Sequence, residues 1–293
     1  MDFLTVTSKG EALALLDRFG DAAAVMGGGT IIAPRLRRCG GGAETVIHVG
    51  RAPDLAGLSP DWIGAAVTLR QLAEAPQLAA YDGLRRAAAL SGSWQIQGVG
   101  TIGGNLCDAA PYADLVPPLL VHGATVTLES LREGSRILPL ADFLLGPHRV
   151  ARGAHEMLTG VSLEARPART ADAFVKVTRR GGMEFSTVSL AIRLSLAEDG
   201  ETVEEARIAV GAMAPLPFRA EAAEGLLRGQ RLSDTLLAEA GQAALIPAAP
   251  QTDVRASAEY RRAVLPRLLA RALRDGARAA AACPPGPPPC RLP

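Results

Sequence analysis

The sequence predicts an α+β protein whose larger first half is followed by a smaller domain of antiparallel sheet and helices. Two patterns predict it: short apolar runs alternate with amphipathic stretches in the first half, and strand-like runs precede helix-like runs in the second. With 293 residues, of which 48% are apolar, the chain can bury one large core or two moderate ones.

The first half is expected to alternate strands and helices from its strand-like N-terminus onward. Ser8 and Glu11 resemble a capping box ahead of a helix over residues 12–19. A strand over 22–25 precedes a helix that opens at Ile31 with proline in its first turn. Further strands are expected over 45–49, 124–128 and 136–139, and further helices over 69–80 and 81–90.

The second half is expected to begin near Arg169. Three strands should form its antiparallel sheet, and three helices should pack on that sheet. The strands are expected over 174–178, 187–196 and 206–210, and the helices over 220–228, 233–244 and 257–273. Six of the last ten residues are proline, which excludes a helix or a central strand there and predicts an extended or disordered tail.

Two glycine-bearing segments carry the most information about function. The segment Gly27-Gly28-Gly29-Thr30 lies between an expected strand and an expected helix, an arrangement that holds a phosphate at a helix N-terminus. The segment Thr101-Ile102-Gly103-Gly104-Asn105 is expected to be a loop whose paired glycines let successive N–H groups converge on an anion. Asp114 is placed to accept a hydrogen bond from a sugar hydroxyl.

The second segment also has a plainer interpretation, and the three-glycine run by itself is weak evidence. The second could be a tight turn between strands, followed by a helix broken by proline. Neither matches Gly-x-Gly-x-x-Gly or the P-loop pattern, and neither contains a phosphate-binding lysine. One extended diphosphate held mainly by backbone amides explains two such segments in one chain better than two separate sites.

With these segments in this order, the sequence resembles the medium, FAD-binding subunit of the molybdenum hydroxylases, the family that includes carbon monoxide dehydrogenase flavoprotein and xanthine dehydrogenase. The family's Thr-Ile-Gly-Gly-Asn loop is matched without change from Thr101, and its Ala-Gly-Gly-Thr loop is matched from Gly27. Its Pro-x-x-Asp-x-x-Pro segment is matched around Asp114. Further matching segments follow in the family's order at 143–147, 156–159, 174–180, 185–191, 210–219 and 253–261.

The resemblance implies a two-lobed FAD-binding domain of the PCMH (vanillyl-alcohol oxidase-like) type over 1–168, with lobes of about 1–52 and 53–168. A C-terminal domain of the CO dehydrogenase flavoprotein type would cover 169–275, and a Pro-rich tail 276–293. Lys176 and the 179–184 loop would lie near the isoalloxazine, where positive charge favours the anionic reduced flavin. The residues implied to hold FAD are Gly27, Gly28, Gly29, Thr30, Ile31, Thr101, Ile102, Gly103, Gly104, Asn105, Asp114 and Lys176.

Some residues depart from the family pattern or have two interpretations. Ile31 stands where the family often has a polar residue, and Met183-Glu184 where it tends to have aspartate, so individual contacts to the cofactor can differ. Tyr112 or Trp94 could stack on the flavin ring, but we expect both to be packing aromatics.

The family resemblance also implies partners and a role. No complete catalytic side-chain set is recognisable, so the chemistry would belong to the cofactor. The chain would relay electrons from iron–sulfur clusters on a small 2Fe–2S subunit to NAD, quinone, dioxygen or another acceptor. A large molybdopterin subunit would hydroxylate the substrate, in a heterotrimer or its dimer. Alternatives are a stand-alone flavin oxidoreductase and a flavin-free assembly module.

Composition excludes several other classes. A net charge of +1 argues against nucleic acid or an anionic membrane surface as the main partner. No apolar run is long enough to cross a bilayer, and an N-terminus with an acid at position 2 does not resemble an export signal, so we expect a cytoplasmic protein. The four cysteines and four histidines show no metal-ligand spacing, which predicts no metal site and a buried filler role for Cys107.

Overall fold

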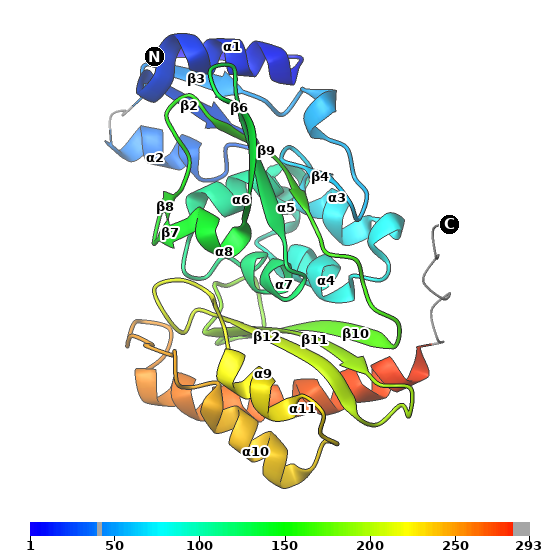
Figure 1. The fold of residues 1–293 in the computed structure, drawn as a ribbon. Coiled ribbons are helices and arrows are strands. Elements are labelled where there is room, and N and C mark those ends of the chain that lie inside the picture. Colours follow the sequence, from blue (N-terminus) through cyan, green and yellow to red (C-terminus); the bar gives the residue numbers. More distant parts are fainter. Residues whose placement is uncertain (40–42, 284–293) are drawn as a thin grey trace, which may run out of the picture.

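The computed structural model describes residues 1–39 and 43–283 and has the α+β architecture that the sequence predicts (Figure 1). Three layers follow one another in the view of Figure 1: a small N-terminal sheet with α1, a central part with a second sheet and most of the short helices, and a C-terminal sheet backed by three helices. The C-terminal sheet is antiparallel, which confirms the expectation for that half.

The N-terminal sheet is parallel and has the order β1-β3-β2. Ser8 caps the helix that follows β1, as expected, and because Ser8 is the N-cap the helix starts at Lys9 and not at residue 12. The Glu11 carboxylate accepts from the N–H of Thr7 instead of from that of the cap residue. The elements of this part are β1 (Asp2–Thr5), α1 (Lys9–Phe19), β2 (Ala23–Met26), α2 (Ile32–Cys39) and β3 (Thr45–His48).

The central part contains a four-stranded sheet of order β4-β9-β5-β6 and a small hairpin. The helix expected over 69–80 is broken, because Pro76 cannot continue it; α3 ends at Glu74 and a single 3₁₀ turn follows. The strands are β4 (Ile63–Gly64), β5 (Thr125–Ser130), β6 (Gly134–Pro139), β7 (Leu144–Gly146), β8 (Arg149–Val150) and β9 (Met157–Ser162). The helices are α3 (Leu69–Glu74), α4 (Asp82–Leu90), α5 (Trp94–Val99), α6 (Ile102–Asp108), α7 (Val116–Val121) and α8 (Leu140–Phe143), with 3₁₀ turns at Gly20–Ala22, Pro53–Leu55 and Pro76–Leu78.

The C-terminal sheet has the order β10-β11-β12-β13, and its last helix is longer than expected. Helix α11 continues to Ala282 because its last turns are almost all alanine, the strongest helix former, so the predicted tail cannot begin at 276. The prolines that begin at 284 lie outside the described residues. The elements are β10 (Thr170–Val177), β11 (Val188–Leu196), β12 (Val203–Gly211), β13 (Phe218–Arg219), α9 (Glu221–Leu227), α10 (Asp234–Ala243) and α11 (Ala258–Ala282).

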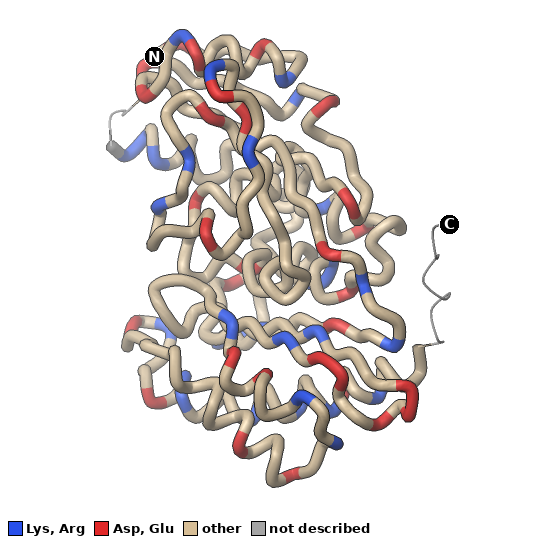
Figure 2. The backbone as a smooth tube through the Cα atoms, viewed as in Figure 1, with Lys and Arg blue, Asp and Glu red and all other residues tan. Residues whose placement is uncertain are grey.

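Charged side chains of both signs are spread over all three layers (Figure 2). Neither sign forms a continuous stripe in this view, which agrees with the near-zero net charge of the sequence. Among the described helices, none combines the length and the apolar composition that a bilayer crossing requires.

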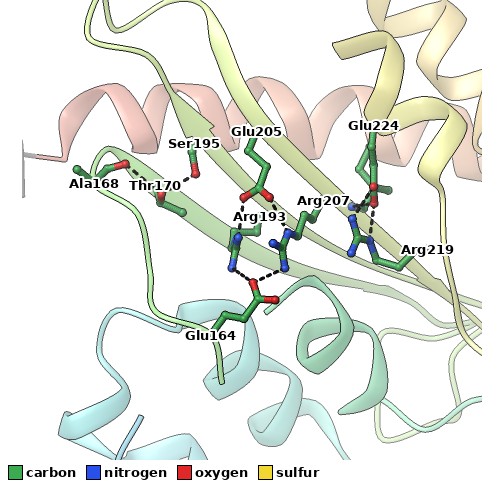
Figure 3. Close-up of polar contacts among 10 residues, drawn as sticks. Glu164, Ala168, Thr170, Arg193, Ser195, Glu205, Arg207, Arg219 and Glu224 are labelled. Atoms are coloured by element: carbon green, nitrogen blue, oxygen red, sulfur yellow. Dashed lines mark hydrogen bonds and ion pairs between the residues drawn. The ribbon is translucent and has the colours of Figure 1, made fainter. Parts of the chain in front are cut away.

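An ionic cluster joins the central part to the C-terminal sheet (Figure 3). Glu164 lies just after β9; its Oε2 is 2.6 Å from Nη1 of Arg207 and 3.7 Å from Nη1 of Arg193. Arg193 and Arg207 are cross-strand neighbours on β11 and β12, and Glu205 pairs with both. Arg193 is buried, so the cluster places a desolvated charge between the central part and the C-terminal sheet, which carries Lys176.

An ion pair between the half-exposed Arg136 and the buried Glu156 supports the central sheet and makes stability depend on pH. Arg136 on β6 donates to both carboxylate oxygens of Glu156, at 2.6 and 2.7 Å, and the Gly153 N–H adds a third bond at 2.6 Å. The hydrogen bonds from Arg136 hold the pKa of Glu156 below its usual range. A carboxyl group whose pKa is lowered in the folded state stabilises the protein at pH values above its ordinary pKa. This contribution is lost as pH falls through the folded-state pKa.

We therefore expect Glu156→Gln to lower the free energy of unfolding by about 2 kcal/mol at neutral pH, with the deficit closing below roughly pH 4. Urea unfolding of both proteins across this pH range measures it. A deficit that stays constant in acid would show that the carboxylate charge contributes nothing.

Candidate cofactor site

A large cleft opens between the N-terminal sheet, the central part and the C-terminal sheet. Its volume is about 1270 Å³, above the roughly 300–1,000 Å³ of most small-molecule sites, so it can take an extended dinucleotide. Both glycine-bearing segments line it, and so do Asp114 and Lys176. Residues from both halves of the chain therefore contribute to one site.

The structure brings the two segments into direct contact. A Cβ atom added to Gly27 would lie 2.5 Å from Oγ1 of Thr101, and one added to Gly28 would lie 1.6 Å from the carbonyl oxygen of Val99. No side chain fits at 28, because the obstacle is backbone. Glycine is required there for close approach of two chain segments.

The first segment presents unused backbone donors. Within the described residues, the N–H groups of Gly28, Gly29, Thr30 and Ile31 have no backbone or side-chain acceptor. Gly29 has φ +70°, and the segment runs into the first turn of α2. Successive free N–H groups at a helix N-terminus form an anion-binding concavity.

The second segment differs from the expected loop. Thr101 is the N-cap of α6, and its Oγ1 accepts from the Gly104 N–H at 3.1 Å, so most of the segment is helical. The N–H groups of Ile102 and Gly103 donate to the carbonyls of Val67 and Ala65. These amides are already bonded within the protein and cannot converge on an anion, which corrects that part of the sequence interpretation.

Asn105 lines the cleft and has one polar atom without a partner in the described part of the chain. Its Oδ1 is buried without a hydrogen-bond partner among the described residues, while Ile102 points its side chain into the core. A buried acceptor without a partner is costly, and a hydroxyl donor of a bound sugar would satisfy it. The second segment therefore supplies a wall and a side-chain acceptor.

Replacing Asn105 with leucine should separate binding from folding. The cofactor-free protein is expected to keep its free energy of unfolding or gain slightly, because an unsatisfied polar atom is removed. The Kd for FAD should rise about tenfold, which corresponds to one lost hydrogen bond. Urea unfolding and titration with FAD measure the two effects, and unchanged affinity would exclude contact between Asn105 and the cofactor.

Asp114 and Lys176 form a buried pair at another wall of the cleft. Lys176 Nζ lies 2.6 Å from Oδ2 of Asp114, and the hydroxyls of Ser186 and Ser91 donate to the same carboxylate at 2.6 and 3.4 Å. Both charged side chains are at most 7% exposed. Burial raises the pKa of Asp114 above its usual value, against the opposing effect of Lys176. Neither charge is available as a free ion.

Aromatic side chains meet at the same wall. The rings of Tyr112 and Phe185 lie 4.2 Å apart, and the Arg255 guanidinium is 5.2 and 5.1 Å from their centroids. Tyr112 and Phe185 line the cleft. Trp94 does not: it is exposed, beneath the guanidinium of Arg70. Of the two aromatics considered from the sequence, only Tyr112 lies at the site.

Sequence reasoning missed several residues of the cleft. Ser91 and Ser186 hold Asp114, and Arg35 pairs with Asp108 at 2.9 Å between α2 and α6. Arg35 could have been found from the sequence, because it lies one turn into the helix that follows the glycines. The cleft is also lined by three cationic side chains, although the glycine-bearing segments themselves contain no lysine: Arg38, Arg149 and Arg152.

Cys107 lies in the cleft wall, where burial raises the pKa of its thiol to about 11. The thiol is therefore protonated at neutral pH and is a poor nucleophile. Within 1–39 and 43–283, no group of three His, Cys, Asp or Glu side chains is arranged to hold a metal ion.

Comparisons with known proteins agree over most of the chain. The family described as the FAD binding domain in molybdopterin dehydrogenase matches residues 1–164, and the CO dehydrogenase flavoprotein C-terminal domain matches 173–275. The carbon monoxide dehydrogenase medium chain of Hydrogenophaga pseudoflava is 29% identical, over 91% of this chain and 93% of that one. The xanthine dehydrogenase FAD-binding subunit of Escherichia coli O157:H7 is 30% identical, over 82% and 83%.

Solved structures give the same result for the fold. A structure of the carbon monoxide dehydrogenase from Hydrogenophaga pseudoflava, in a form that lacks the Mo-pyranopterin moiety of its cofactor, superimposes with a TM-score of 0.89 at 30% identity. The match covers 96% of this chain and 98% of that one.

Proposed function

Because the chain belongs to the FAD-binding medium subunits of the molybdenum hydroxylases, we propose that it relays electrons between iron–sulfur clusters on a partner subunit and an external acceptor. Its cofactor is FAD, and it is a subunit of an oxidoreductase of the carbon monoxide dehydrogenase and xanthine dehydrogenase type. FAD exchanges electrons singly with clusters and in pairs with acceptors, which is the chemistry a relay requires.

The residues of the cleft fit FAD. Free N–H groups at residues 28–31 would hold its diphosphate, and the unpartnered Oδ1 of Asn105 would accept from a sugar hydroxyl. Gly27 and Thr101 would shape the contact between the two segments. Lys176, held by Asp114, would stand at the isoalloxazine end beside Phe185.

One observation carries the relay proposal: segments of both matched family domains line the same cleft. Gly28 belongs to the first domain, and Lys176 and Phe185 belong to the second. Cys107 and Cys283 are free, and among the described residues no three potential metal ligands are grouped, so the clusters would be on another polypeptide.

The remaining parts of the proposal follow from the family. The partners would be a small 2Fe–2S subunit and a large molybdopterin subunit in a heterotrimer or its dimer, with NAD, quinone or dioxygen as acceptor and a cytoplasmic location. The chain would divide near residue 168 into its FAD-binding and C-terminal domains.

Stopped-flow absorbance tests the relay directly. The FAD-loaded chain is mixed anaerobically with its chemically reduced iron–sulfur partner or with NADH alone. We expect rapid bleaching of the FAD absorbance with the reduced partner. Equally fast bleaching by NADH without any partner, and none with the reduced partner, would instead identify a stand-alone flavin oxidoreductase.

A further inference from the structure

The buried carboxylate of Asp114 has partners that can exchange donor and acceptor roles. Its Oδ1 accepts from Oγ of Ser186 at 2.6 Å, and its Oδ2 accepts from Oγ of Ser91 at 3.4 Å and from Nζ of Lys176 at 2.6 Å. A serine hydroxyl can donate to a carboxylate and can also accept from a protonated carboxyl group. Asp114 can therefore take up a proton in place without leaving the new O–H group unpaired.

Glu156, the other buried carboxyl group described above, has the opposite arrangement. Its oxygens are held by the Arg136 guanidinium and the Gly153 N–H, which can only donate. The pKa values move in opposite directions as well: hydrogen bonds from Arg136 lower the pKa of Glu156, whereas burial raises the pKa of Asp114. The surroundings of Asp114 suit a group that changes its protonation state, and those of Glu156 suit a fixed charge.

Lys176 connects the Asp114 carboxylate to the cleft. Two of its three N–H groups are used, by Asp114 at 2.6 Å and by the carbonyl of Leu90 at 3.1 Å. The third has no acceptor among the described residues, and Lys176 lines the cleft. One cation therefore adjoins both the carboxylate and the space that a cofactor would fill.

The other charged or titratable groups at this wall have partners of their own. Among the described residues, Lys176 is the charged group that counteracts the effect of burial on the pKa of Asp114. One cation therefore balances this carboxylate. The other groups are Arg180 and Glu184, 2.8 Å apart, Arg255 and Asp253, 2.9 Å apart, and Tyr112, whose ring packs on Phe185.

We propose that Asp114 takes up a proton from solvent when the bound FAD is reduced, while Lys176 keeps its charge. The inference rests on the proposed function, which places Lys176 at the isoalloxazine end of FAD. Two electrons would come singly from the iron–sulfur partner, which is oxidised. The ring would gain these two electrons and one proton, and Asp114 would gain the second proton, so the charge within the cleft stays constant.

Electrostatics supplies the reason for this coupling. While FAD is oxidised, the Lys176 charge is balanced by the Asp114 carboxylate. Reduction adds a negative charge to the ring, and one buried ammonium group cannot balance two anions. A new negative charge nearby raises the pKa of a carboxyl group further, so Asp114 becomes protonated and Lys176 then balances the reduced ring.

The pH dependence of the FAD midpoint potential, measured by spectroelectrochemical titration of the FAD-loaded full chain, tests the proposal. Each proton taken up with two electrons contributes about 30 mV per pH unit to the slope, because a tenfold change in proton concentration changes the equilibrium constant tenfold. Near neutral pH we expect the slope of two protons for the wild type and of one proton for Asp114→Asn. Infrared difference spectra should show a protonated carboxyl band on reduction that Asp114→Asn lacks.

Two further variants complete the test. Ser186→Ala serves if Asp114→Asn does not fold, because it leaves both charges in place. It removes a hydrogen bond that favours the ionised carboxylate, so the two-proton slope should extend to higher pH. Asp199→Asn is the control, since Asp199 lies on an exposed turn and pairs with Arg231, and it should keep the wild-type slope.

A one-proton slope in the wild type would overturn the proposal, and so would a two-proton slope in Asp114→Asn, which would assign the second proton to the ring. An unshifted slope in Ser186→Ala would also contradict it. None of these results affects the relay, because the midpoint potential is measured without the iron–sulfur partner. Failure of the reduced partner to bleach FAD would refute the relay and leave the proton measurement intact.

Discussion

Gly28→Ala is expected to weaken FAD binding a hundredfold or more. The added Cβ would stand 1.6 Å from the Val99 carbonyl oxygen and 2.3 Å from its carbon, so the segment must move away from α5. Such a movement displaces the free N–H groups at residues 28–31, and the loss of one or two hydrogen bonds to a charged diphosphate costs about 3 kcal/mol, on the order of a hundredfold in Kd. FAD content and Kd measure the effect.

Alanine variants at two other glycines serve as comparisons for Gly28→Ala. Gly27→Ala meets only the Thr101 side chain, which can rotate at the cost of the α6 cap, about 1 kcal/mol, so its effect should be smaller. Gly225→Ala on α9 meets no atom within 4 Å and should leave FAD binding unchanged while stabilising the fold slightly. Equal FAD affinity in all three variants would mean that the contact between the two segments does not matter.

Lys176→Met is expected to lower the free energy of unfolding by about 3–5 kcal/mol at neutral pH, because it leaves the buried Asp114 carboxylate without its counter-ion. The cost should shrink in acid. When a carboxyl group has a raised pKa in the folded state, the protein loses stability as pH rises through that pKa. Protonation of Asp114 at lower pH therefore removes the unpaired charge. Urea unfolding at several pH values measures both effects.

The double variant Asp114→Asn/Lys176→Met removes both charges and should recover part of the loss, which identifies the cost as an unpaired charge. Arg231→Met serves as the control for an exposed pair. Arg231 and Glu201 are 66 and 61% exposed, so their separation should cost about 1 kcal/mol or less. Similar losses for Lys176→Met and Arg231→Met would contradict the buried pair.

Local chemistry explains why much of the site could be predicted. Three successive glycines between an apolar strand and a helix have few structural uses, so the first segment was recognisable. The antiparallel C-terminal sheet was readable because β11 and β12 are long runs rich in β-branched and apolar residues. Both features depend on neighbours in sequence.

Other features depend on residues distant in sequence and were not predictable. The amides of Ile102 and Gly103 are taken by carbonyls of residues 65–67, and no local pattern reveals that pairing. Likewise, Ser186 reaches Asp114 only because β10 and the loop after it face the central part. The end of α3 is a different case, since Pro76 was visible in the sequence and its effect was underestimated.

One diphosphate should lie where the two glycine-bearing segments meet. An experimental structure of the FAD-loaded chain tests it most directly. We expect diphosphate oxygens within hydrogen-bond distance of the N–H groups of residues 28–31, and a sugar hydroxyl within hydrogen-bond distance of Asn105. A diphosphate bound away from both segments would contradict it.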